Sequence, residues 1–290
     1  MSKHDVPPKS VIQSISQSCT TNLIERRDEG ASSPGHRGLP KQNPENTIRS
    51  LQHAILVGAD GLESDVRMTR DGQVIMMHDM TLDRTTNGTG LVTARNWSGY
   101  VEYLKTGGER VPTLTEVLEL LMREENRDIW IVLDVKDDNS IEILDAIASV
   151  FNIYPNYDFT AQFHIGIWNE EFFIRARKVL PGFPTSFIGS DISLARLLFD
   201  KVESFNLEFI YVFSDQSGFF DEVKSHGRSV FVWTVNKEKD MYKAIKFGVD
   251  AILSDYVDRC LRVRRRRRGG KGLALEEWDK NDVGVEWDWE

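Results

Sequence analysis

The sequence predicts one irregular (β/α)8 TIM barrel, folded as a single domain. Short apolar runs alternate with amphipathic stretches from Gly35 to about residue 260. Strands that alternate with helices pair in parallel, and apolar strand runs are covered on both faces. The chain has 290 residues and 40% hydrophobic content, which is enough for one large core.

Nine segments are candidate strands, one more than an eight-stranded barrel requires. They are the run before His36, Leu62–Val66, Val74–Met77, Ile129–Val135, Phe163–Ile167, Thr185–Ile188, Phe209–Phe213, Val230–Val235 and Ala251–Leu253. One of them is therefore expected to lie outside the barrel. The stretch from Asp65 to Val74 is too short for a helical crossover, and Asp71-Gly72 favours a tight turn. We expect an early hairpin at this point.

Helical patterns occupy the intervals between most of these strands. Apolar residues fall at helix spacing in Asn46–Leu56, Leu114–Met122, Glu170–Val179, Leu194–Phe205 and Asp240–Phe247. Pro44, Asn46 and Thr47 favour the start of the first helix, and either Thr113 or Thr115 is the expected cap of the second.

The chain divides into three parts. Residues 1–33 lack clear periodicity and predict a flexible arm, although Val11, Ile12 and Ile15 fall at helix spacing. Residues 34–260 are expected to form the barrel and to carry any catalytic site. Residues 261–290 join six arginines to an acidic end, and these opposed charge blocks predict a disordered tail. The run Arg264–Arg268 could contact a membrane surface through anionic lipid, or it could be a solvated or import-like segment.

Composition narrows the functional class. A net charge of −9 argues against a general affinity for nucleic acid, because a phosphate backbone selects basic surfaces. Two cysteines are too few for a disulfide framework, and no apolar leader or run of 18 apolar residues occurs. We therefore expect a cytoplasmic protein, at most peripheral to an intracellular membrane.

Three carboxylates at strand ends are the candidate metal ligands. Glu63 and Asp65 are two residues apart on a strand, so their side chains point the same way and can bind one hard cation. Such pairs are common on solvated surfaces, but this one lies in an apolar run between two histidine motifs. The carboxyl ends of barrel strands converge, so Asp134 can complete the site while Lys136 reaches a phosphate oxygen. The alternative for Asp134 and Lys136 is an ion pair at a strand end.

His36 and His78 end different strands and are the candidate catalytic residues. Displacement at a phosphodiester needs a base for the attacking oxygen and an acid for the departing one. Two imidazoles with pKa values near neutrality can divide this work, although either alone is more typical of a hydrogen-bonded core residue. Arg37 supplies a forked donor that matches a phosphate group.

Three further residues are expected to support or line the site. Glu45 lies in the segment Pro44-Glu45-Asn46-Thr47, where it can either support the metal ligands from behind or simply mark a helix start. Trp233 can form a wall of the pocket against the substrate, with core packing as the alternative. Asn236 follows it and can hydrogen-bond to the site.

The order of the motifs resembles the glycerophosphodiester phosphodiesterase family. Between residues 34 and 258 the chain contains GHRG, PENT, GADGLESDVRMTRDGQVIMMHD, LDRTTNGTG, VPTLTEVLELL, LDVK, VWTVN and GVDAILSD, in that order. The resemblance implies a TIM-barrel hydrolase that uses a divalent cation to cleave glycerophosphodiesters into an alcohol and glycerol phosphate. It assigns the catalytic pair to His36 and His78, and two metal carboxylates to Glu63 and Asp65.

The third metal ligand departs from the family pattern. The family usually has Glu in a Glu-x-Lys motif, whereas this chain has Asp134 two residues before Lys136. The shorter side chain leaves the choice of metal and coordination through water open. The Asp-x-Lys variant is similar to fungal phosphatidylglycerol-specific phospholipases C, whose hydrophobic C-terminal anchor is replaced here by charged residues.

The sequence therefore predicts a phosphodiesterase that depends on one divalent cation, Mg²⁺ or Ca²⁺. Its expected partner is a small-molecule or lipid phosphodiester that contains glycerol. Three alternatives stand beside this prediction: a phospholipase of C or D type that acts on intact phospholipid such as phosphatidylglycerol, a non-catalytic metal- or phosphate-binding barrel, and a scaffold that recruits partners through residues 262–268.

Overall fold

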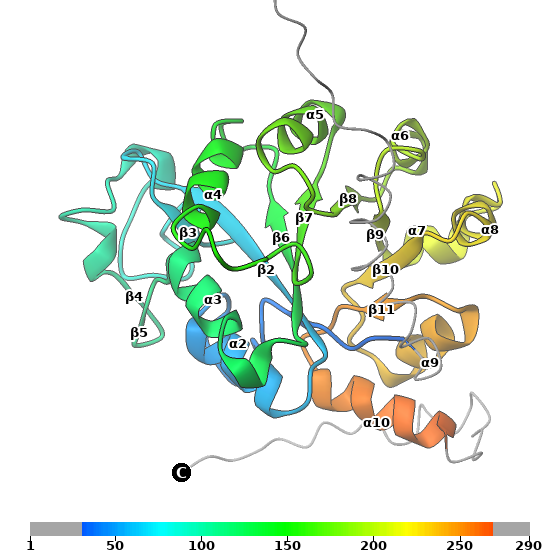
Figure 1. The fold of residues 1–290 in the computed structure, drawn as a ribbon. Coiled ribbons are helices and arrows are strands. Elements are labelled where there is room, and N and C mark those ends of the chain that lie inside the picture. The colour runs from blue at the N-terminus through cyan, green and yellow to red at the C-terminus, as the bar shows by residue number, and fades with distance from the viewer. Residues whose placement is uncertain (1–30, 269–290) are drawn as a thin grey trace, which may run out of the picture.

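Eight parallel strands form the wall of a barrel in the computed structural model, which describes residues 31–268 (Figure 1). Around the wall they are β1 (Gly35–His36), β2 (Gly61–Met68), β6 (Trp130–Val135), β7 (Phe163–Ile167), β8 (Thr185–Gly189), β9 (Ser204–Glu208), β10 (Ser229–Trp233) and β11 (Ala251–Ile252). Bridges from Ser32 to Ala251 and from Gly35 to Ser254 join the last strand to the first. The predicted irregular barrel is confirmed.

Helices cover the outside of this wall (Figure 1). They are α2 (Ile48–Leu56), α3 (Leu114–Leu121), α4 (Ile143–Phe151), α5 (Glu170–Val179), α6 (Ile192–Leu197), α7 (Phe209–Ser214), α8 (Phe219–Ser225), α9 (Glu238–Phe247) and α10 (Val257–Arg268). The main core lies between strands and helices. A smaller inner cluster fills the barrel and consists of Trp130, Val132, Ile188, Phe231, Ala251 and Leu253.

The expected early hairpin is present. β3 (Val74–Met76) runs antiparallel to β2, with Val66 opposite Met76, and is the candidate strand that lies outside the barrel path. The chain then forms a lobe with its own apolar cluster, the short strands β4 (Lys105–Thr106) and β5 (Glu109–Arg110), and 3-10 turns at Val92–Ala94 and Val101–Tyr103. The backbone N–H of Met77 donates to the carbonyl of Asp65, so the hairpin returns the next residue, His78, to the carboxyl end of β2.

One strand was predicted in the wrong place. Phe209–Phe213 is not a strand but most of helix α7, and the strand is β9 just before it. In β9, Phe205 and Leu207 pack outward into the main core, which is the alternation of a strand. In α7 the rings of Phe209 and Phe213 stack 4.5 Å apart, which is the i,i+4 contact of a helix. The helix predicted for Leu194–Phe205 is shorter in the structure, where it is α6 (Ile192–Leu197).

The predicted boundaries of the arm and the tail also change. Ala31 and Ser32 pack against β11 and belong to the barrel, whereas residues 1–30 lie outside the described residues. The tail predicted from residue 261 is helical as far as Arg268, because α10 buries Cys260 and Val263 against the barrel. The predictions for residues 269–290 lie outside the described part of the chain.

Arg262, Arg264 and Arg266 of α10 are paired with carboxylates. Arg262 contacts Glu238 and Asp258, and Arg264 contacts Asp60 at 2.9 Å with only 11% of its side chain exposed. Asp60 directly precedes β2, so this end of α10 lies at the amino end of the barrel wall. Arg264 is therefore not a free surface cation, and a lipid surface bound by its neighbours would meet the barrel at the end opposite the carboxyl ends of the strands.

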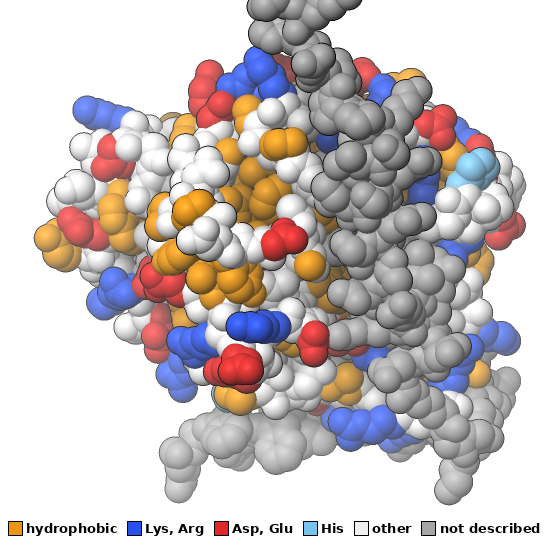
Figure 2. Space-filling model, in the orientation of Figure 1, with side chains coloured by type: hydrophobic (Ala, Val, Ile, Leu, Met, Phe, Trp, Pro, Cys, Tyr) orange, Lys and Arg blue, Asp and Glu red, His pale blue; other side chains and the backbone are white. Residues whose placement is uncertain are grey.

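The described surface carries charges of both signs. On the face that Figure 2 shows, basic and acidic side chains are interspersed around a central group of hydrophobic side chains. No helix within residues 31–268 is both long enough and apolar enough to cross a bilayer.

The structure selects one of the two candidate caps of α3. The Thr113 hydroxyl accepts the backbone N–H of Glu116, whose carboxylate accepts the N–H of Thr113 in return. We expect Thr113→Ala to lower the free energy of unfolding by about 1 kcal/mol in urea denaturation, and Thr115→Ala by less than about 0.5 kcal/mol. Equal losses in the two variants would contradict this assignment.

Candidate active site

A pocket of about 290 Å³ lies at the carboxyl ends of the barrel strands. Its lining consists of His36, Arg37, Glu63, Asp65, His78, Asp134, Lys136, Trp168, Ile188, Asn206, Trp233, Thr234 and Leu253. All the predicted site residues are in this set except Glu45 and Asn236, which lie behind it. The spatial convergence predicted from strand ends is therefore present.

Three buried carboxylates lie together on β2 and β6. Asp65 and Asp134 are direct partners in the register of these strands, and Glu63 precedes Asp65 by two residues on the same face. Each side chain offers an oxygen within 4.8 Å of the others, and the three residues are only 1–5% exposed. Carboxylate oxygens are ligands that Mg²⁺ and Ca²⁺ prefer.

Two cationic side chains balance part of this charge. Lys136 Nζ lies 3.0 Å from Asp65 Oδ1 and 2.5 Å from Asp134 Oδ2. Arg37 Nε lies 3.3 Å from Asp65 Oδ2, and its backbone N–H donates to Glu63 Oε2 at 2.9 Å. Arg37 has a φ of 56° and Gly38 a φ of 85°, a left-handed turn that directs this N–H at Glu63.

The pKa values of the carboxyl groups reflect this balance. Burial, together with the charge of Asp65, raises the pKa of Glu63 to about 7. Burial likewise raises the pKa of Asp134. Burial opposes ionisation of Asp65 as well, but Lys136 and Arg37 hold its pKa below the usual range. A divalent cation would relieve the remaining repulsion between these groups, so the donor set fits such an ion.

His36 is held by a carboxylate from the last turn of the barrel. Its Nδ1 lies 2.7 Å from Asp255 Oδ1, which leaves Nε2, 4.0 Å from Glu63 Oε2, on the pocket side. Asn236 donates to the other oxygen of Asp255 at 2.9 Å. Burial alone would lower the pKa of His36, but the bond to Asp255 and the charge of Glu63 outweigh it and raise that pKa.

His78 has the same arrangement on the hairpin side. Its Nδ1 lies 2.7 Å from Asp79 Oδ1, so Nε2 is again the ring nitrogen left for the pocket. Arg67, which is buried, donates two hydrogen bonds to the carbonyl oxygen of His78 and pairs with Asp138. Arg67, which lies on β2, therefore holds the backbone of His78 in place.

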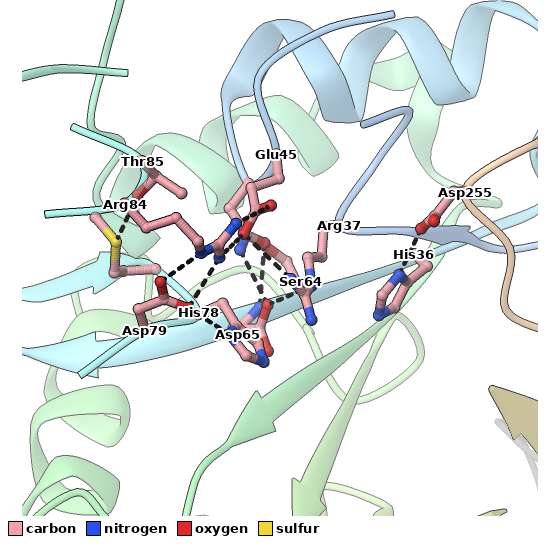
Figure 3. Close-up of polar contacts among 12 residues, drawn as sticks. His36, Arg37, Glu45, Ser64, Asp65, His78, Asp79, Arg84, Thr85 and Asp255 are labelled. Carbon is pink, nitrogen blue, oxygen red and sulfur yellow. Dashed lines mark hydrogen bonds and ion pairs between the residues drawn. The ribbon is translucent and has the colours of Figure 1, made fainter. Parts of the chain in front are cut away.

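A chain of ion pairs links Arg37 to Asp79, the partner of His78 (Figure 3). Arg84 donates to Asp79 at 2.5 and 2.8 Å and to Glu45 at 3.0 and 2.7 Å. Glu45 in turn accepts from Arg37 at 3.1 Å. Hydrogen bonds from Arg84 lower the pKa of Asp79 to about 2. Glu45 thus contacts the arginines, and does not contact the carboxylate cluster directly.

The opposite side of the pocket is aromatic and apolar. The indole N–H of Trp168 donates to Asp134 Oδ1 at 2.7 Å, and that of Trp233 donates to the carbonyl of Asn206 at 3.0 Å. The two indole rings meet edge to face, with centroids 6.1 Å apart. Ile188 and Leu253 lie beside them.

Several contacts in the site escaped the sequence analysis. Asp255 follows a predicted strand within the quoted motif GVDAILSD, and Arg84 lies in LDRTTNGTG, but neither position alone indicates its partner. Trp168 directly follows β7, and Trp233 is the last residue of β10, so a tryptophan at a strand end was the signal that could have found it. Asn46 is more than a helix start, since it adopts a φ of 59° and donates to Asp65 Oδ2 at 2.9 Å.

Comparisons with a family model and with known proteins point to the same family. Residues 36–259 match the glycerophosphoryl diester phosphodiesterase family. A glycerophosphodiester phosphodiesterase of Caldanaerobacter subterraneus subsp. tengcongensis is 32% identical over 76% of this chain and 92% of its own length.

Two solved structures are similar in fold. An Oleispira antarctica phosphodiesterase in complex with its product sn-glycerol-3-phosphate has a TM-score of 0.70 and 22% identity, over 82% of this chain and 98% of that one. The glycerophosphodiester phosphodiesterase of Thermotoga maritima has a TM-score of 0.66 and 23% identity, over 80% of this chain and 98% of that one.

Proposed function

Because this chain belongs to the glycerophosphoryl diester phosphodiesterase family, whose members are phosphoric diester hydrolases, we propose that the pocket cleaves a glycerophosphodiester into an alcohol and glycerol phosphate. The observation that carries the proposal is the convergence of two carboxylate-bound imidazoles and three buried carboxylates on one pocket. The product complex of the Oleispira antarctica relative supports glycerol phosphate as the product here.

The carboxylates of Glu63, Asp65 and Asp134 would hold one divalent cation, Mg²⁺ or Ca²⁺. Such an ion supplies charge stabilisation to phosphoryl oxygens as negative charge develops on them. Trp168 fixes the orientation of Asp134 through its N–H, which leaves the other oxygen of this shorter carboxylate directed at Lys136.

Arg37 and Lys136 bind the phosphodiester. Both cations line the pocket beside Asp65, so an anionic phosphoryl group that enters the pocket meets two positive side chains. Asn46 and Glu45 hold Asp65 and Arg37 in place from behind.

His36 and His78 divide the proton transfers. In each ring the carboxylate on Nδ1 accepts the N–H and leaves Nε2 free to take or give a proton. One imidazole accepts a proton from the attacking oxygen, and the other donates a proton to the departing alcohol. The symmetry of the two pairs allows the rings to exchange these roles.

Direct hydrolysis assays test the proposal. Purified full-length protein with Mg²⁺ or Ca²⁺ is expected to release glycerol phosphate from glycerophosphocholine or glycerophosphoglycerol. If it hydrolyses no diester of a broad panel but still binds inorganic phosphate, the barrel is a non-catalytic binding module and the proposal is wrong.

The contact between Asp255 and His36 gives a sharper expectation. Asp255→Asn keeps the shape of the side chain but no longer fixes the proton on Nδ1, so kcat should fall about tenfold or more while KM changes little. Lys41→Met is the control, because Lys41 lies near Asp255 at 3.9 Å without touching His36. A change in KM alone for Asp255→Asn would contradict the positioning role.

Lipid substrates are a second candidate, favoured by exposed apolar side chains near His78. Met80 and Leu91 are 50% and 46% exposed and lie on paired segments of the lobe. An acyl chain that leaves the pocket on this side would cover them. Hydrolysis of phosphatidylglycerol in vesicles, with none of soluble diesters, would make the lipid the substrate instead.

A further inference from the structure

Arg84 reaches the active site from the lobe, which lies between β3 and α3. Two residues before it, Leu82 is fully buried in the apolar cluster of the lobe, and its backbone N–H donates to the carbonyl oxygen of Gly90. Two residues after it, Thr86 donates both its hydroxyl and its backbone N–H to the carbonyl oxygen of Leu82. The backbone on both sides of Arg84 is therefore held in place, and the side chain extends from this point to Asp79 and Glu45 (Figure 3).

The guanidinium group of Arg84 bridges these two carboxylates. Its Nε and Nη2 donate to the two oxygens of Asp79, and its Nη1 and Nη2 donate to the two oxygens of Glu45. The side chain is 50% exposed, and a single ion pair at such a position would contribute little to the stability of the fold. Two paired sets of hydrogen bonds from one planar group instead fix the orientation of both carboxylates.

Asp79 transmits this constraint to the ring of His78. The same oxygen, Asp79 Oδ1, accepts from Arg84 Nη2 at 2.8 Å and lies 2.7 Å from His78 Nδ1. Among residues 31–268 the carboxylate of Asp79 has no polar partner other than these two side chains. Arg84 is therefore what holds this carboxylate in the orientation that faces the ring, because Asp79 is otherwise free to turn toward solvent.

Glu45 transmits the constraint in the other direction, to Arg37. Glu45 Oε1 accepts from Arg84 Nη2 at 2.7 Å and from Arg37 Nη1 at 3.1 Å. Arg37 lines the pocket, and its Nε lies 3.3 Å from Asp65 Oδ2. One side chain of the lobe thus lies a single carboxylate away from a proton-transfer ring and a single carboxylate away from a phosphate-binding cation.

We propose that Arg84 is a positioning residue that aligns the imidazole of His78 with the guanidinium of Arg37, acting on each through one carboxylate. This inference rests on the proposed phosphodiesterase function and adds a residue on which the same site depends. Because Arg84 is anchored in the lobe, the packing of the lobe sets the alignment of the proton-transfer group with the bound phosphodiester.

The test measures kcat and KM for single changes along this chain of ion pairs, with a saturating divalent cation and the diester that the wild-type protein hydrolyses fastest. Asp79→Asn should lower kcat about tenfold with little change in KM. Glu45→Gln should mainly raise KM, by about fivefold. Arg84→Ala should show both effects, because it releases both carboxylates.

A second arginine of the lobe is the matched control. The side chain of Arg110 is 60% exposed and pairs with Glu116, and neither residue lines the pocket. Arg110→Ala should therefore leave kcat and KM unchanged.

Rescue separates positioning from a general structural role. Guanidinium chloride at a concentration that does not denature the protein should raise kcat of Arg84→Ala severalfold, because the position is half exposed, and sodium chloride at equal ionic strength should not. Arg84→Lys should remain close to Arg84→Ala, since one ammonium group does not reproduce the planar fork between two carboxylates. The midpoint of urea denaturation of Arg84→Ala should equal that of the wild type.

Unchanged kcat and KM in Arg84→Ala, or wild-type activity in Arg84→Lys, overturns the inference alone. A loss of activity in Arg84→Ala that follows a lower urea midpoint and does not respond to guanidinium also overturns it, because the role would then be structural. A wild-type protein that hydrolyses no diester is a different result, since it overturns the proposed function and the inference together.

Discussion

His36→Ala and His78→Ala are each expected to lower kcat by at least about a hundredfold, which is the usual contribution of a positioned general acid or base. Each ring is held through Nδ1 by its own carboxylate, so truncation removes a proton-transfer group already aligned with the pocket. Circular dichroism should remain unchanged, because both rings line a cavity and neither belongs to an apolar core cluster.

The double variant sharpens this expectation. If the two rings serve one displacement, losing both should cost much less than the product of the two single effects, because groups that act as a unit are not additive. His226→Ala is the control, since His226 lies on the surface at the end of α8. Full turnover in the variant that lacks both His36 and His78 would refute the mechanism.

Removal of the divalent cation is expected to abolish turnover, and Mg²⁺ or Ca²⁺ should restore it. The three carboxylates are buried and mutually close, and Lys136 and Arg37 offset only part of their charge, so a divalent cation among them would relieve the remaining repulsion. Glu63→Gln, Asp65→Asn and Asp134→Asn should each raise the cation concentration for half-maximal activity by at least about tenfold. The measurement is a cation titration of the chelated enzyme.

A nearby carboxylate outside the cluster provides the comparison. Asp137→Asn removes an exposed charge one residue after Lys136, and it should leave the cation titration unchanged. Full activity in the presence of a strong chelator, or an equal shift for Asp137→Asn and Asp134→Asn, would contradict the assignment of the three ligands.

The barrel could be predicted because its strands carry unambiguous patterns. β2 and β6 are almost wholly buried, and the short interval before β3 allows only a hairpin. The segment Phe209–Phe213 was misassigned because a short apolar run fits a strand or a helix equally well. Only the packing of Phe205 and Leu207 in the preceding strand distinguishes the two possibilities.

The pocket-lining residues of the polar half were predictable because strand ends of a barrel converge. Several of their supporting contacts were not, since these depend on partners far along the chain: Asp255 is 219 residues from His36, and Arg84 is 39 residues from Glu45. The same reason applies to α10, since Arg264 and Arg262 pair with Asp60 and Glu238 on distant elements. The order of charged residues in the sequence does not show which distant residues become partners in the fold.

A crystal structure with Ca²⁺ and sn-glycerol 3-phosphate tests the central claim most directly. The account predicts one ion within about 2.3–2.6 Å of oxygens from Glu63, Asp65 and Asp134, with the phosphoryl group between the rings of His36 and His78. An ion bound elsewhere, or a phosphoryl group that reaches neither imidazole, would contradict it.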